Sequence, residues 1–383
     1  MRIGLVVPGF SADPTDWCIP ALRHLARTLA RTDEVRVLAI RYPYHAARYA
    51  VDGVEVIALG GATRRGPATL GVWRTALEAF RAEHRRRPFD VLHAFWATES
   101  GLLTAMAGRV LRIPTLISLA GGELVALPAI AYGDQRIAWE RFKVGASLRL
   151  ACALSAGSRQ LVDHARRYVG GRSVHRLPLG VDLDLFTPDG VGSSRAPRLV
   201  HVGTLTGVKD QATLLRAFGR LRRERPTATL DIVGDGPLRP ELERLASDVA
   251  APGAVRFRGA VDHARLPPMY RSATAFVLSS RHEAQGMVVL EAAACAIPVV
   301  GTRVGVVPEL TSAVAAVTDD RGLAASLAAV LDDPDPHARA VFDRARAEFG
   351  LDESAARFRD VYMSLLGAER QPTTPERVQT LSG

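Results

Sequence analysis

The sequence predicts an α/β protein built from two doubly wound domains that face each other across a cleft. Short β-branched runs alternate with helical stretches rich in Ala, Leu and Arg, which is typical of parallel sheets covered by helices. The alternation stops over 182–197, where Pro, Gly, Ser and Asp gather without periodicity, and then restarts. A chain of 383 residues is also too long for one ordinary core. Sheets of this kind bind ligands beyond the carboxyl ends of their strands.

The first half, 1–186, supplies the first predicted domain. The opening run MRIGLVVPGF suits a first strand better than a signal peptide, because no cleavage site follows it. The expected strands are 2–7, 35–40, 54–58, 90–94, 114–118 and 173–177, and the expected helices are 20–31, 71–86 and 98–111.

The second half, 187–352, repeats the pattern and supplies the second predicted domain. The expected strands are 198–203, 228–233, 254–258, 274–278 and 298–301, and the expected helices are 211–224, 238–249, 265–271 and 287–296. Residues 353–383 comprise an amphipathic helix over 353–367 and a polar tail that we expect to be disordered.

The composition is that of an ordinary globular protein, with 48% hydrophobic and 23% charged residues. No window offers 18 uncharged apolar residues, so we expect no membrane span. Cys18, Cys152 and Cys295 lie in apolar surroundings without the spacing of a metal site. Reduced thiols in a cytoplasmic protein are the simplest interpretation.

The net charge of +9 is confined to the first half. Residues 1–186 hold 25 Lys and Arg against 16 Asp and Glu, whereas the remaining residues hold 24 of each sign. A basic half, with runs such as Arg85-Arg86-Arg87, attracts phosphate-bearing partners or the inner, anionic face of a membrane. The alternative is a solvated face in an arginine-rich protein. Nucleic acid is disfavoured, because the basic clusters are not interleaved with aromatic residues.

One strand end in the second half has the features of a phosphate site. HVGTLTGVKDQATLLRAF places Gly203 at the end of an expected strand and Lys209 just before an expected helix, with Asp210 as its N-cap. The backbone comes close to a ligand there, and the ammonium adds a point charge. The chain has only two lysines, so composition does not explain this one, although a solvated surface lysine is the alternative. The turn at 234–236 repeats the pattern more weakly.

Two glutamates, Glu283 and Glu291, flank an expected helix start in the stretch RHEAQGMVVLE. The amides of Gly286, Met287 and Val288 point out of that helix N-terminus, which is a ready anion site. Glu291 lies inside the helix, where a carboxylate accepts two hydroxyls of a sugar ring, and Glu283 reaches the other side of the anion. The expected ligand carries both phosphate and vicinal hydroxyls, and a nucleotide sugar satisfies both requirements.

These motifs resemble the retaining family 4 glycosyltransferases (group 1), which have the GT-B fold. EAQGMVVLE matches the family's glutamate–seven residues–glutamate pattern, and HVGTLTGVKD, IVGDGPL, VRFRGAV and PVVGTRVGVVPEL appear in the family's order and spacing. The resemblance is strong over 198–311 and weaker but continuous over 1–186. It implies two Rossmann-like domains, of which the first binds the acceptor and the second the nucleotide sugar, with the C-terminal helix packing back on the first.

The resemblance also implies roles for particular residues. The catalytic residues would be Glu283, which faces the transferred sugar, and Lys209, which contacts the diphosphate. The donor-binding residues would be Gly203, Thr204, Lys209, Gly234, Arg258, Val261, Glu283, Gln285, Gly286, Met287, Val288 and Glu291. The acceptor-binding residues would be Gly9, Phe10, Trp17, His93, Gly121, Gly122 and Glu123. For His93 the alternative is a satisfied structural histidine.

The sequence departs from the family pattern at four positions. Thr204 stands where many members carry an arginine, and it brings a hydroxyl without a charge. Ala120 stands where a histidine near the reacting carbon is frequent, so a usual catalytic contact is missing. Gln285 replaces a common aromatic residue, and Val306 replaces a common glycine.

The implied activity is that of a hexosyltransferase that moves a sugar from a nucleotide sugar to an acceptor with retention of configuration. Front-face attack would depend on positioning and on stabilisation of the leaving diphosphate. We expect no cofactor and no metal, because helix amides and Lys209 carry the phosphate charge. The expected acceptor is a sugar, glycolipid, glycan or other anionic or membrane-associated molecule, and no nucleic acid. The alternatives are a sugar-nucleotide epimerase or hydrolase of the same fold, and a non-catalytic sugar-nucleotide-binding subunit.

Overall fold

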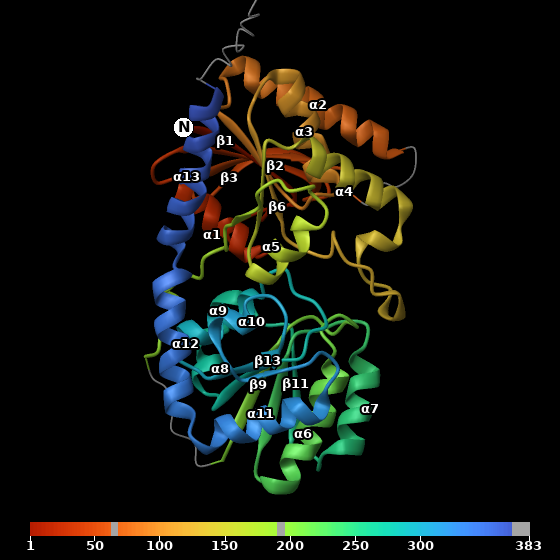
Figure 1. Cartoon of the computed structure of the whole chain (residues 1–383), viewed down its shortest axis with the longest axis vertical. Coiled ribbons are helices and arrows are strands. Elements are labelled where there is room, and N and C mark those ends of the chain that lie inside the picture. Colours follow the sequence, from red (N-terminus) through yellow and green to blue (C-terminus); the bar gives the residue numbers. More distant parts are fainter. Residues whose placement is uncertain (63–67, 190–195, 370–383) are drawn as a thin grey trace, which may run out of the picture.

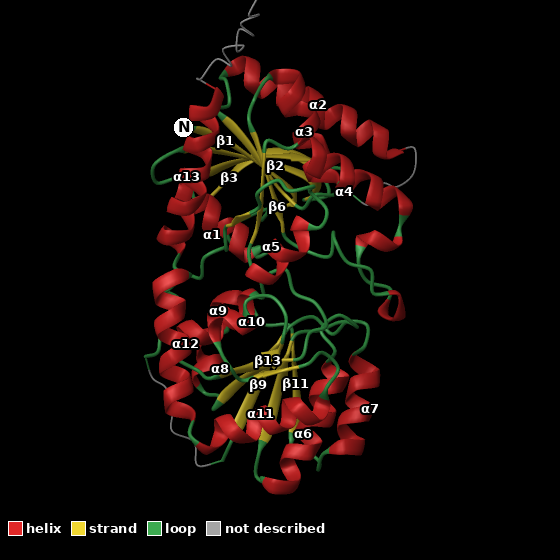
Figure 2. Cartoon of the chain, viewed as in Figure 1, coloured by secondary structure: helices red, strands yellow, loops and turns green. Residues whose placement is uncertain are grey.

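The computed structural model describes residues 1–62, 68–189 and 196–369 and shows two α/β lobes stacked along the long axis of the molecule (Figure 1). Each lobe is built on one sheet with helices packed around it (Figure 2). The prediction of two doubly wound domains is confirmed.

The first lobe holds an eight-stranded sheet in the order β3-β4-β2-β1-β5-β6-β7-β8. Its pairs are parallel, except that β3 runs antiparallel to β4. The strands are β1 (Arg2–Gly9), β2 (Glu34–Tyr42), β3 (Ala46–Val51), β4 (Val54–Leu59), β5 (Val91–Phe95), β6 (Thr115–Leu119), β7 (Ala153–Ala156) and β8 (His175–Arg176). The helices are α1 (Pro20–Leu29), α2 (Ala68–Arg86), α3 (Glu99–Leu111), α4 (Ala138–Leu150) and α5 (Arg159–Arg166), with 3-10 turns η1 (Pro128–Ile130) and η2 (Asp134–Arg136).

Central strand β1 shows why the strands of this sheet are continuous apolar runs in the sequence. It is buried almost throughout, because helices cover both faces of a parallel sheet. Its partners on the two sides are β2 and β5, so that Leu5 lies beside Val37 and His93. Helix α1 begins with Pro20, which is favoured at a first helical position, and buries Leu22 on the sheet side.

The second lobe holds a six-stranded sheet in the order β11-β10-β9-β12-β13-β14, and the pairs are all parallel. The strands are β9 (Arg198–Val202), β10 (Thr229–Val233), β11 (Val255–Gly259), β12 (Ala275–Leu278), β13 (Val299–Thr302) and β14 (Val314–Ala315). Its helices are α6 (Gln211–Glu224), α7 (Arg239–Val249), α8 (Pro267–Arg271), α9 (Met287–Ala294), α10 (Val307–Leu310), α11 (Asp320–Asp332) and α12 (Pro334–Glu348), with 3-10 turn η3 (His263–Arg265). The last helix of the chain is α13 (Leu351–Glu369).

The chain crosses between the lobes twice, at neighbouring points. The amide of Val181 donates to the carbonyl of Phe349 at 2.8 Å, and Val181 forms an isolated bridge with Gly350. Phe186 already packs in the core of the second lobe, so the boundary predicted at 186/187 lies a few residues after the crossing. Part of the predicted linker, 190–195, lies outside the described residues.

Helix α13 packs back on the first lobe, as expected. It runs beside α1 along one edge of the molecule (Figure 1). Its side chains Phe358 and Tyr362 are buried in the same core cluster as β1 and α1. The tail that was predicted to be disordered, from 370 onward, lies outside the described residues.

Candidate functional site

A cavity of about 210 Å³ lies where the two lobes meet. Its first-lobe wall includes Trp96 and Ala120, which follow the carboxyl ends of β5 and β6. Its second-lobe wall includes Glu283, Gly286 and Met287, from the loop after β12 and the start of α9. The carboxyl ends of strands in both sheets therefore border one cavity, which is where doubly wound sheets bind ligands.

Lys209 and Glu283 form an ion pair at this junction. Lys209 Nζ lies 2.6 Å from Glu283 Oε1, and the hydroxyl of Ser280 donates to the same oxygen at 2.6 Å. Burial alone raises the pKa of Glu283, but Lys209 and Ser280 outweigh it, so the pKa stays below its ordinary value. The structure thus pairs the two predicted catalytic residues, with Glu283 ionised.

Helix α9 begins with the amides that were predicted to bind an anion. Gly286 has φ of +92°, a conformation that glycine adopts without strain, and this turns the chain into the helix. The amide of Val289 donates to the carbonyl of Gly286 at 3.0 Å. The amides of Gly286, Met287 and Val288 come before that bond, where a helix has no acceptors of its own.

Glu291 is held by two side chains of its own lobe. His263 Nε2 lies 3.0 Å from Glu291 Oε1, and the Tyr270 hydroxyl donates to Oε2 at 2.8 Å. Burial and the nearby carboxylate raise the pKa of Tyr270 far above its ordinary value, so it is a permanent donor. Since a carboxylate accepts about four hydrogen bonds, each oxygen retains capacity for one further hydroxyl.

The glycines Gly203 and Gly234 lie together beside Lys209. A Cβ added at Gly234 would lie 2.1 Å from the carbonyl oxygen of Gly203, and Gly234 has φ of +126°. One added at Gly203 would lie 3.7 Å from the side chain of Lys209. Close backbone approach explains the glycine at 234, whereas Gly203 lies beside the aliphatic part of the Lys209 side chain.

Three other predicted donor residues of this lobe make contacts within the protein. Thr204 is exposed, and its carbonyl accepts from Gln211 at 3.0 Å. Arg258 points its guanidinium to Asp231 at 2.7 Å, and Val261 packs against the core of the second lobe. Their contacts with a nucleotide remain predictions.

Gln285 makes a contact between the lobes that the sequence did not predict. Its amide accepts from the Leu179 N–H at 2.9 Å and donates to the Leu179 carbonyl at 2.7 Å. The side chain is thereby engaged in joining the loop before α9 to the segment that leads into the crossing. Its amide thus serves the contact between the lobes. Gln285 also lines the cavity, and its contact with a donor stays a prediction.

The prediction that His93 and Phe10 contact an acceptor is wrong. His93 is fully buried; its Nδ1 lies 2.7 Å from the Tyr362 hydroxyl and its Nε2 lies 2.7 Å from the Ser118 hydroxyl. Burial lowers the pKa of His93 to about 3, so it is neutral. Phe10 is buried in the same core.

The loop after β6 needs a second correction. Glu123 is buried and accepts hydrogen bonds from the amides of Ala97, Ala120 and Gly121 at 3.3, 3.0 and 2.7 Å. It therefore shapes this loop and does not face an acceptor. Gly121 does reach the cleft, because its carbonyl lies 3.1 Å from His282 Nε2 of the second lobe.

Two further residues that were predicted to bind the acceptor are glycines packed against aromatic side chains. Gly9 is buried, and a Cβ there would lie 3.1 Å from Tyr42. Gly122 lies against Tyr132, whose ring would be 2.9 Å from an added Cβ. Gly9 is thus a packing residue, and an acceptor contact of Gly122 stays a prediction.

Three residues near the site were missed or misplaced by the sequence. Trp17 was assigned to the acceptor, yet its ring centroid lies 5.2 Å from that of His263, on the donor side. His263 was not singled out, although a histidine just after a strand end is a usable signal. Trp96 was also missed; it has φ of +66° and lines the cavity beside Ala120.

The described part of the chain offers no group of three or more His, Cys, Asp or Glu that could hold a metal ion. Asp182 and Asp184 are two residues apart, but Asp182 accepts from the amides of Asp184 and Leu185, both at 3.1 Å, which is the pattern of a turn. The absence of a metal requirement remains a prediction. Within 1–62, 68–189 and 196–369, no helix has the length and apolarity to cross a bilayer.

Comparisons with known proteins agree with this architecture. The profile of the family described as Glycosyl transferases group 1 matches residues 196–333, and that of the Glycosyl transferase 4-like domain matches residues 19–180. A D-inositol 3-phosphate glycosyltransferase of Streptomyces avermitilis is 31% identical over 343 residues, which cover 80% of this chain and 72% of the relative. A glycogen synthase of Mycobacterium tuberculosis is 36% identical over 193 residues, so the match spans only 47% of that protein and 47% of this one.

A solved structure shows the same fold over nearly the whole chain. The sucrose-phosphate synthase of Thermosynechococcus elongatus superposes with a TM-score of 0.77 at 22% identity, covering 96% of this chain and 100% of that one. Both halves match family profiles, and the relative from Streptomyces matches across both lobes. This chain therefore belongs to the group 1 glycosyltransferases and has their GT-B fold of two Rossmann-like domains.

Proposed function

We propose that the protein transfers a hexose from a nucleoside diphosphate sugar to an acceptor, with retention of configuration. The observation that carries this is the convergence of three kinds of group in the second lobe. Lys209 and the first amides of α9 suit a diphosphate, and Glu291 suits a ribose. The family membership supports the same donor site.

In this reaction the protein acts on the leaving group. The α9 amides and the ammonium of Lys209 stabilise the charge that develops on the departing diphosphate. Glu283 keeps Lys209 in place and faces the cavity where the sugar would lie. The acceptor then enters from the first-lobe wall at Trp96 and Ala120, on the same side as the departing group.

The outer surface of the first lobe supports an acceptor at an anionic membrane. Exposed apolar side chains there form an aromatic patch: Trp139 stacks on Trp73 with centroids 6.0 Å apart and on Phe142 at 5.3 Å. Trp139 is 51% and Phe142 59% exposed. Exposed arginines on α2, η2 and α4 are Arg74, Arg81, Arg85, Arg86, Arg136, Arg141 and Arg149. Exposed aromatic rings on a lobe that also exposes these arginines suit an interface of acidic lipid.

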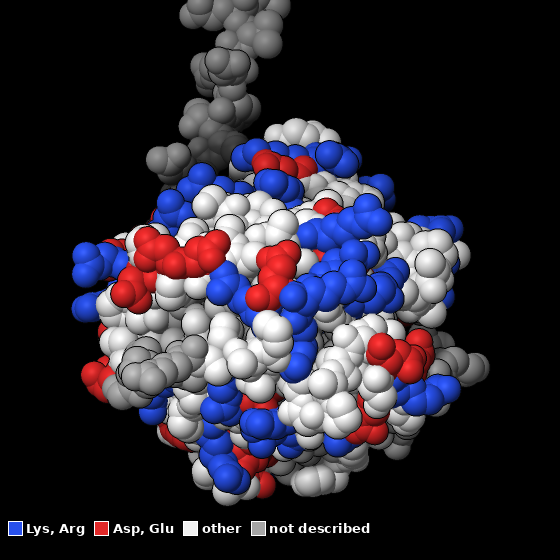
Figure 3. Space-filling view, turned by 90° about the horizontal axis from the view of Figure 1, so that it is seen from below, with Lys and Arg blue, Asp and Glu red and all other residues white. Residues whose placement is uncertain are grey.

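The second lobe is not free of basic surface, although its sequence is neutral overall. Lys and Arg side chains gather in a band on its lower end (Figure 3). A hollow of about 510 Å³ beside α6 and the end of α7 is lined by Arg216, Arg220, Arg222 and Arg223. Both lobes therefore carry exposed basic residues, and the aromatic patch is the surface feature that distinguishes the first lobe from the second.

Vesicle sedimentation of the full chain tests the membrane contact. Trp139→Ser with Phe142→Ser should reduce binding to vesicles that contain phosphatidylglycerol. Arg216→Gln with Arg223→Gln, on the second lobe, is the matched control and should bind as the wild type does. Equal loss in both variants would mean that general charge, and not the aromatic patch, makes the contact.

A panel of nucleotide sugars with and without acceptors tests the reaction. Binding should raise the melting temperature, because a ligand at 100 times its Kd adds about 2.7 kcal/mol to the unfolding free energy. Anomeric analysis of the product by NMR tests retention, and turnover in EDTA tests metal independence. Nucleotide release without acceptor would favour the epimerase or hydrolase, and binding without turnover the non-catalytic subunit.

A further inference from the structure

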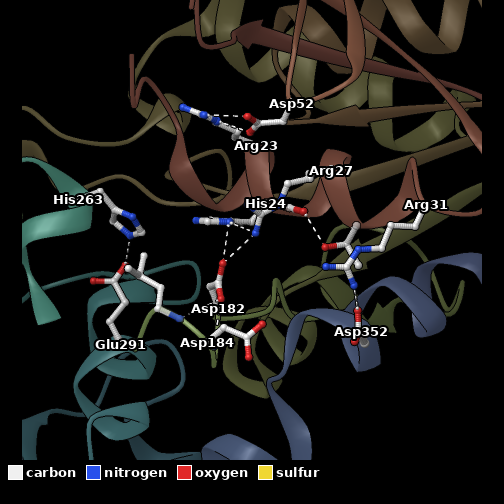
Figure 4. A network of polar contacts seen from close by, with 12 residues as sticks. Arg23, His24, Arg27, Arg31, Asp52, Asp182, Asp184, His263, Glu291 and Asp352 are labelled. Atoms are coloured by element: carbon white, nitrogen blue, oxygen red, sulfur yellow. Dashed lines mark hydrogen bonds and ion pairs between the residues drawn. The ribbon is translucent and has the colours of Figure 1, made fainter. Parts of the chain in front are cut away.

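The first lobe contacts His263, the partner of Glu291 in the candidate ribose site, through a cluster of aromatic rings. Figure 4 shows two of the residues, His24 and His263, together with Glu291. His263, which holds Glu291, lies with its ring centroid 5.2 Å from Trp17 and 5.7 Å from His24. Trp17 and His24 themselves lie 5.7 Å apart. Both belong to the first lobe, in the loop before α1 and in α1, whereas His263 and Glu291 belong to the second.

We propose that Trp17 and His24 are positioning residues for Glu291: by packing on His263 they fix the carboxylate for the ribose only when the two lobes are together. This inference rests on the proposed donor site. It assigns to the first lobe a share in donor binding, in addition to its expected role with the acceptor.

The ring of His263 owes its orientation mainly to these contacts. It has three aromatic neighbours, of which Phe186 lies at 5.2 Å in an edge-on arrangement and the other two come from the first lobe. Its Nε2 makes the contact with Glu291, whereas its Nδ1 is buried without a hydrogen-bond partner among the described residues. No hydrogen bond on the far side of the ring therefore replaces the packing.

Trp17 is in turn braced by its own lobe. The guanidinium carbon of Arg23 lies 4.3 Å from the centre of the Trp17 ring, within the range of a cation–π contact. Two hydrogen bonds of 2.7 and 3.0 Å tie Arg23 to Asp52, and a third of 2.9 Å ties it to the Pro14 carbonyl. The indole is thus a fixed surface against which His263 packs.

Arg27, in the last turn of α1, and Arg31, two residues after the end of α1, contact the two crossings of the chain. Arg27 Nη2 lies 2.8 Å from Asp182 Oδ2 at the first crossing, and Arg31 Nη1 lies 2.9 Å from Asp352 Oδ1 at the second (Figure 4). Because α1 contacts the ring cluster through His24 and the first crossing through Arg27, separation of the lobes would disturb both contacts together. Donor binding and lobe closure should consequently favour each other, as reciprocal linkage requires.

The test is whether Trp17 matters only to ligands that use Glu291. Calorimetry first identifies which of UDP, GDP and ADP the wild type binds, and then compares it with its 2′,3′-dideoxy analogue. Trp17→Leu should weaken binding of the ribonucleotide by about fivefold or more, within the usual range of coupling between sites. The dideoxy analogue, which offers Glu291 no hydroxyls, should bind the variant and the wild type alike. Tyr44→Leu, at an exposed aromatic residue of the same lobe, is the matched control and should change neither affinity.

A double-mutant cycle separates positioning from folding. In a Glu291→Gln background the effect of Trp17→Leu on the ribonucleotide should largely disappear, because the group that Trp17 positions has been altered. His24→Leu gives a second variant should Trp17→Leu fold poorly. Equal losses for both nucleotides, or no loss for either, would overturn the inference while leaving the donor site intact. A wild type that binds none of the three diphosphates would instead overturn the proposed function.

Discussion

Lys209 and Glu283, which are 74 residues apart in the sequence, meet at 2.6 Å between the carboxyl ends of two strands of the second sheet. The side chain of Glu283 is 11% exposed, so its negative charge is stabilised chiefly by this ammonium and by Ser280. An arriving diphosphate would share Lys209 with Glu283. The pair therefore links the phosphates of a donor to the position of the carboxylate beside the sugar.

The first prediction concerns Lys209. Replacement by Met should lower affinity for a nucleoside diphosphate far more than for the bare nucleoside, because only phosphates sense the ammonium. Lys209→Arg should restore the affinity only in part, since a planar guanidinium does not reproduce a point charge. Calorimetry with both ligands measures this. Equal losses for the two ligands would show that the lysine only supports the fold.

The second prediction concerns Glu283. Glu283→Gln keeps the shape of the side chain but removes the charge that positions Lys209. We expect nucleoside diphosphate affinity to stay within a few-fold of the wild type and the rate of sugar transfer to fall by at least tenfold, about 1.4 kcal/mol in the barrier. Single-turnover kinetics measure the rate. An unchanged rate would remove Glu283 from the catalytic residues.

The third prediction concerns Glu291. Glu291→Ala removes the acceptor of two ribose hydroxyls and leaves the Tyr270 hydroxyl without its partner. Donor affinity should fall by roughly 2–3 kcal/mol, the usual range for hydrogen bonds to charged groups. Glu353→Ala, an exposed residue of α13, is the control and should bind donor normally. Wild-type affinity in Glu291→Ala would exclude this carboxylate from the site.

The fourth prediction concerns Gly234, for which the structure gives a reason other than ligand binding. Gly234→Ala would place a methyl 2.1 Å from the Gly203 carbonyl oxygen, at a positive φ. We expect the unfolding free energy to fall by about 2 kcal/mol or more from strain and overpacking. Urea unfolding measures it, with Gly71→Ala, whose added Cβ meets open space, as the control. Full stability of Gly234→Ala would contradict the close approach.

Much of the fold was predictable, because its elements carry strong local patterns. Helix α6 was expected over 211–224 and begins and ends at those residues. Strand β7, ALSA, was missed since its small residues have little strand preference and its pairing with β6 and β8 depends on distant parts of the chain. Strand β3 was missed too, although the Asp52-Gly53 turn, with φ of 51° and 77°, is a recognisable hairpin signal.

The sequence predicted residues of the candidate site, but it did not predict which residues they contact. The positions of Glu283 and Glu291 around a helix start follow from local sequence, whereas the ion pair with Lys209 depends on how β9 and β12 lie side by side. The error at His93 has the same origin. A strand-end histidine does not reveal that Tyr362, 269 residues later, will cover it.

The last prediction follows from histidines that the fold keeps neutral. Burial lowers the pKa of His93 to about 3, and it lowers that of His201 to about 4 against the opposing hydrogen bond to the Val277 carbonyl. Both pKa values lie below the ordinary value of 6.5. Below pH 6.5 the unfolded chain therefore binds protons at these two histidines that the folded protein does not bind. The contribution of these neutral histidines to the unfolding free energy is complete above pH 6.5. It is lost as the pH falls through the pKa values that they have in the folded protein.

Between about pH 6 and pH 4.5 each of these histidines should therefore lower the unfolding free energy by up to about 1.4 kcal/mol per pH unit. Urea unfolding at a series of pH values measures the slope. His201→Asn should reduce that slope by the share of one histidine, even where it lowers stability at every pH. His45→Asn removes an exposed histidine and should leave the slope as it is. If His201→Asn does not change the slope, His201 takes up its proton in the folded protein as it does in the unfolded chain. A histidine contributes to the slope only when the unfolded chain binds its proton and the folded protein does not.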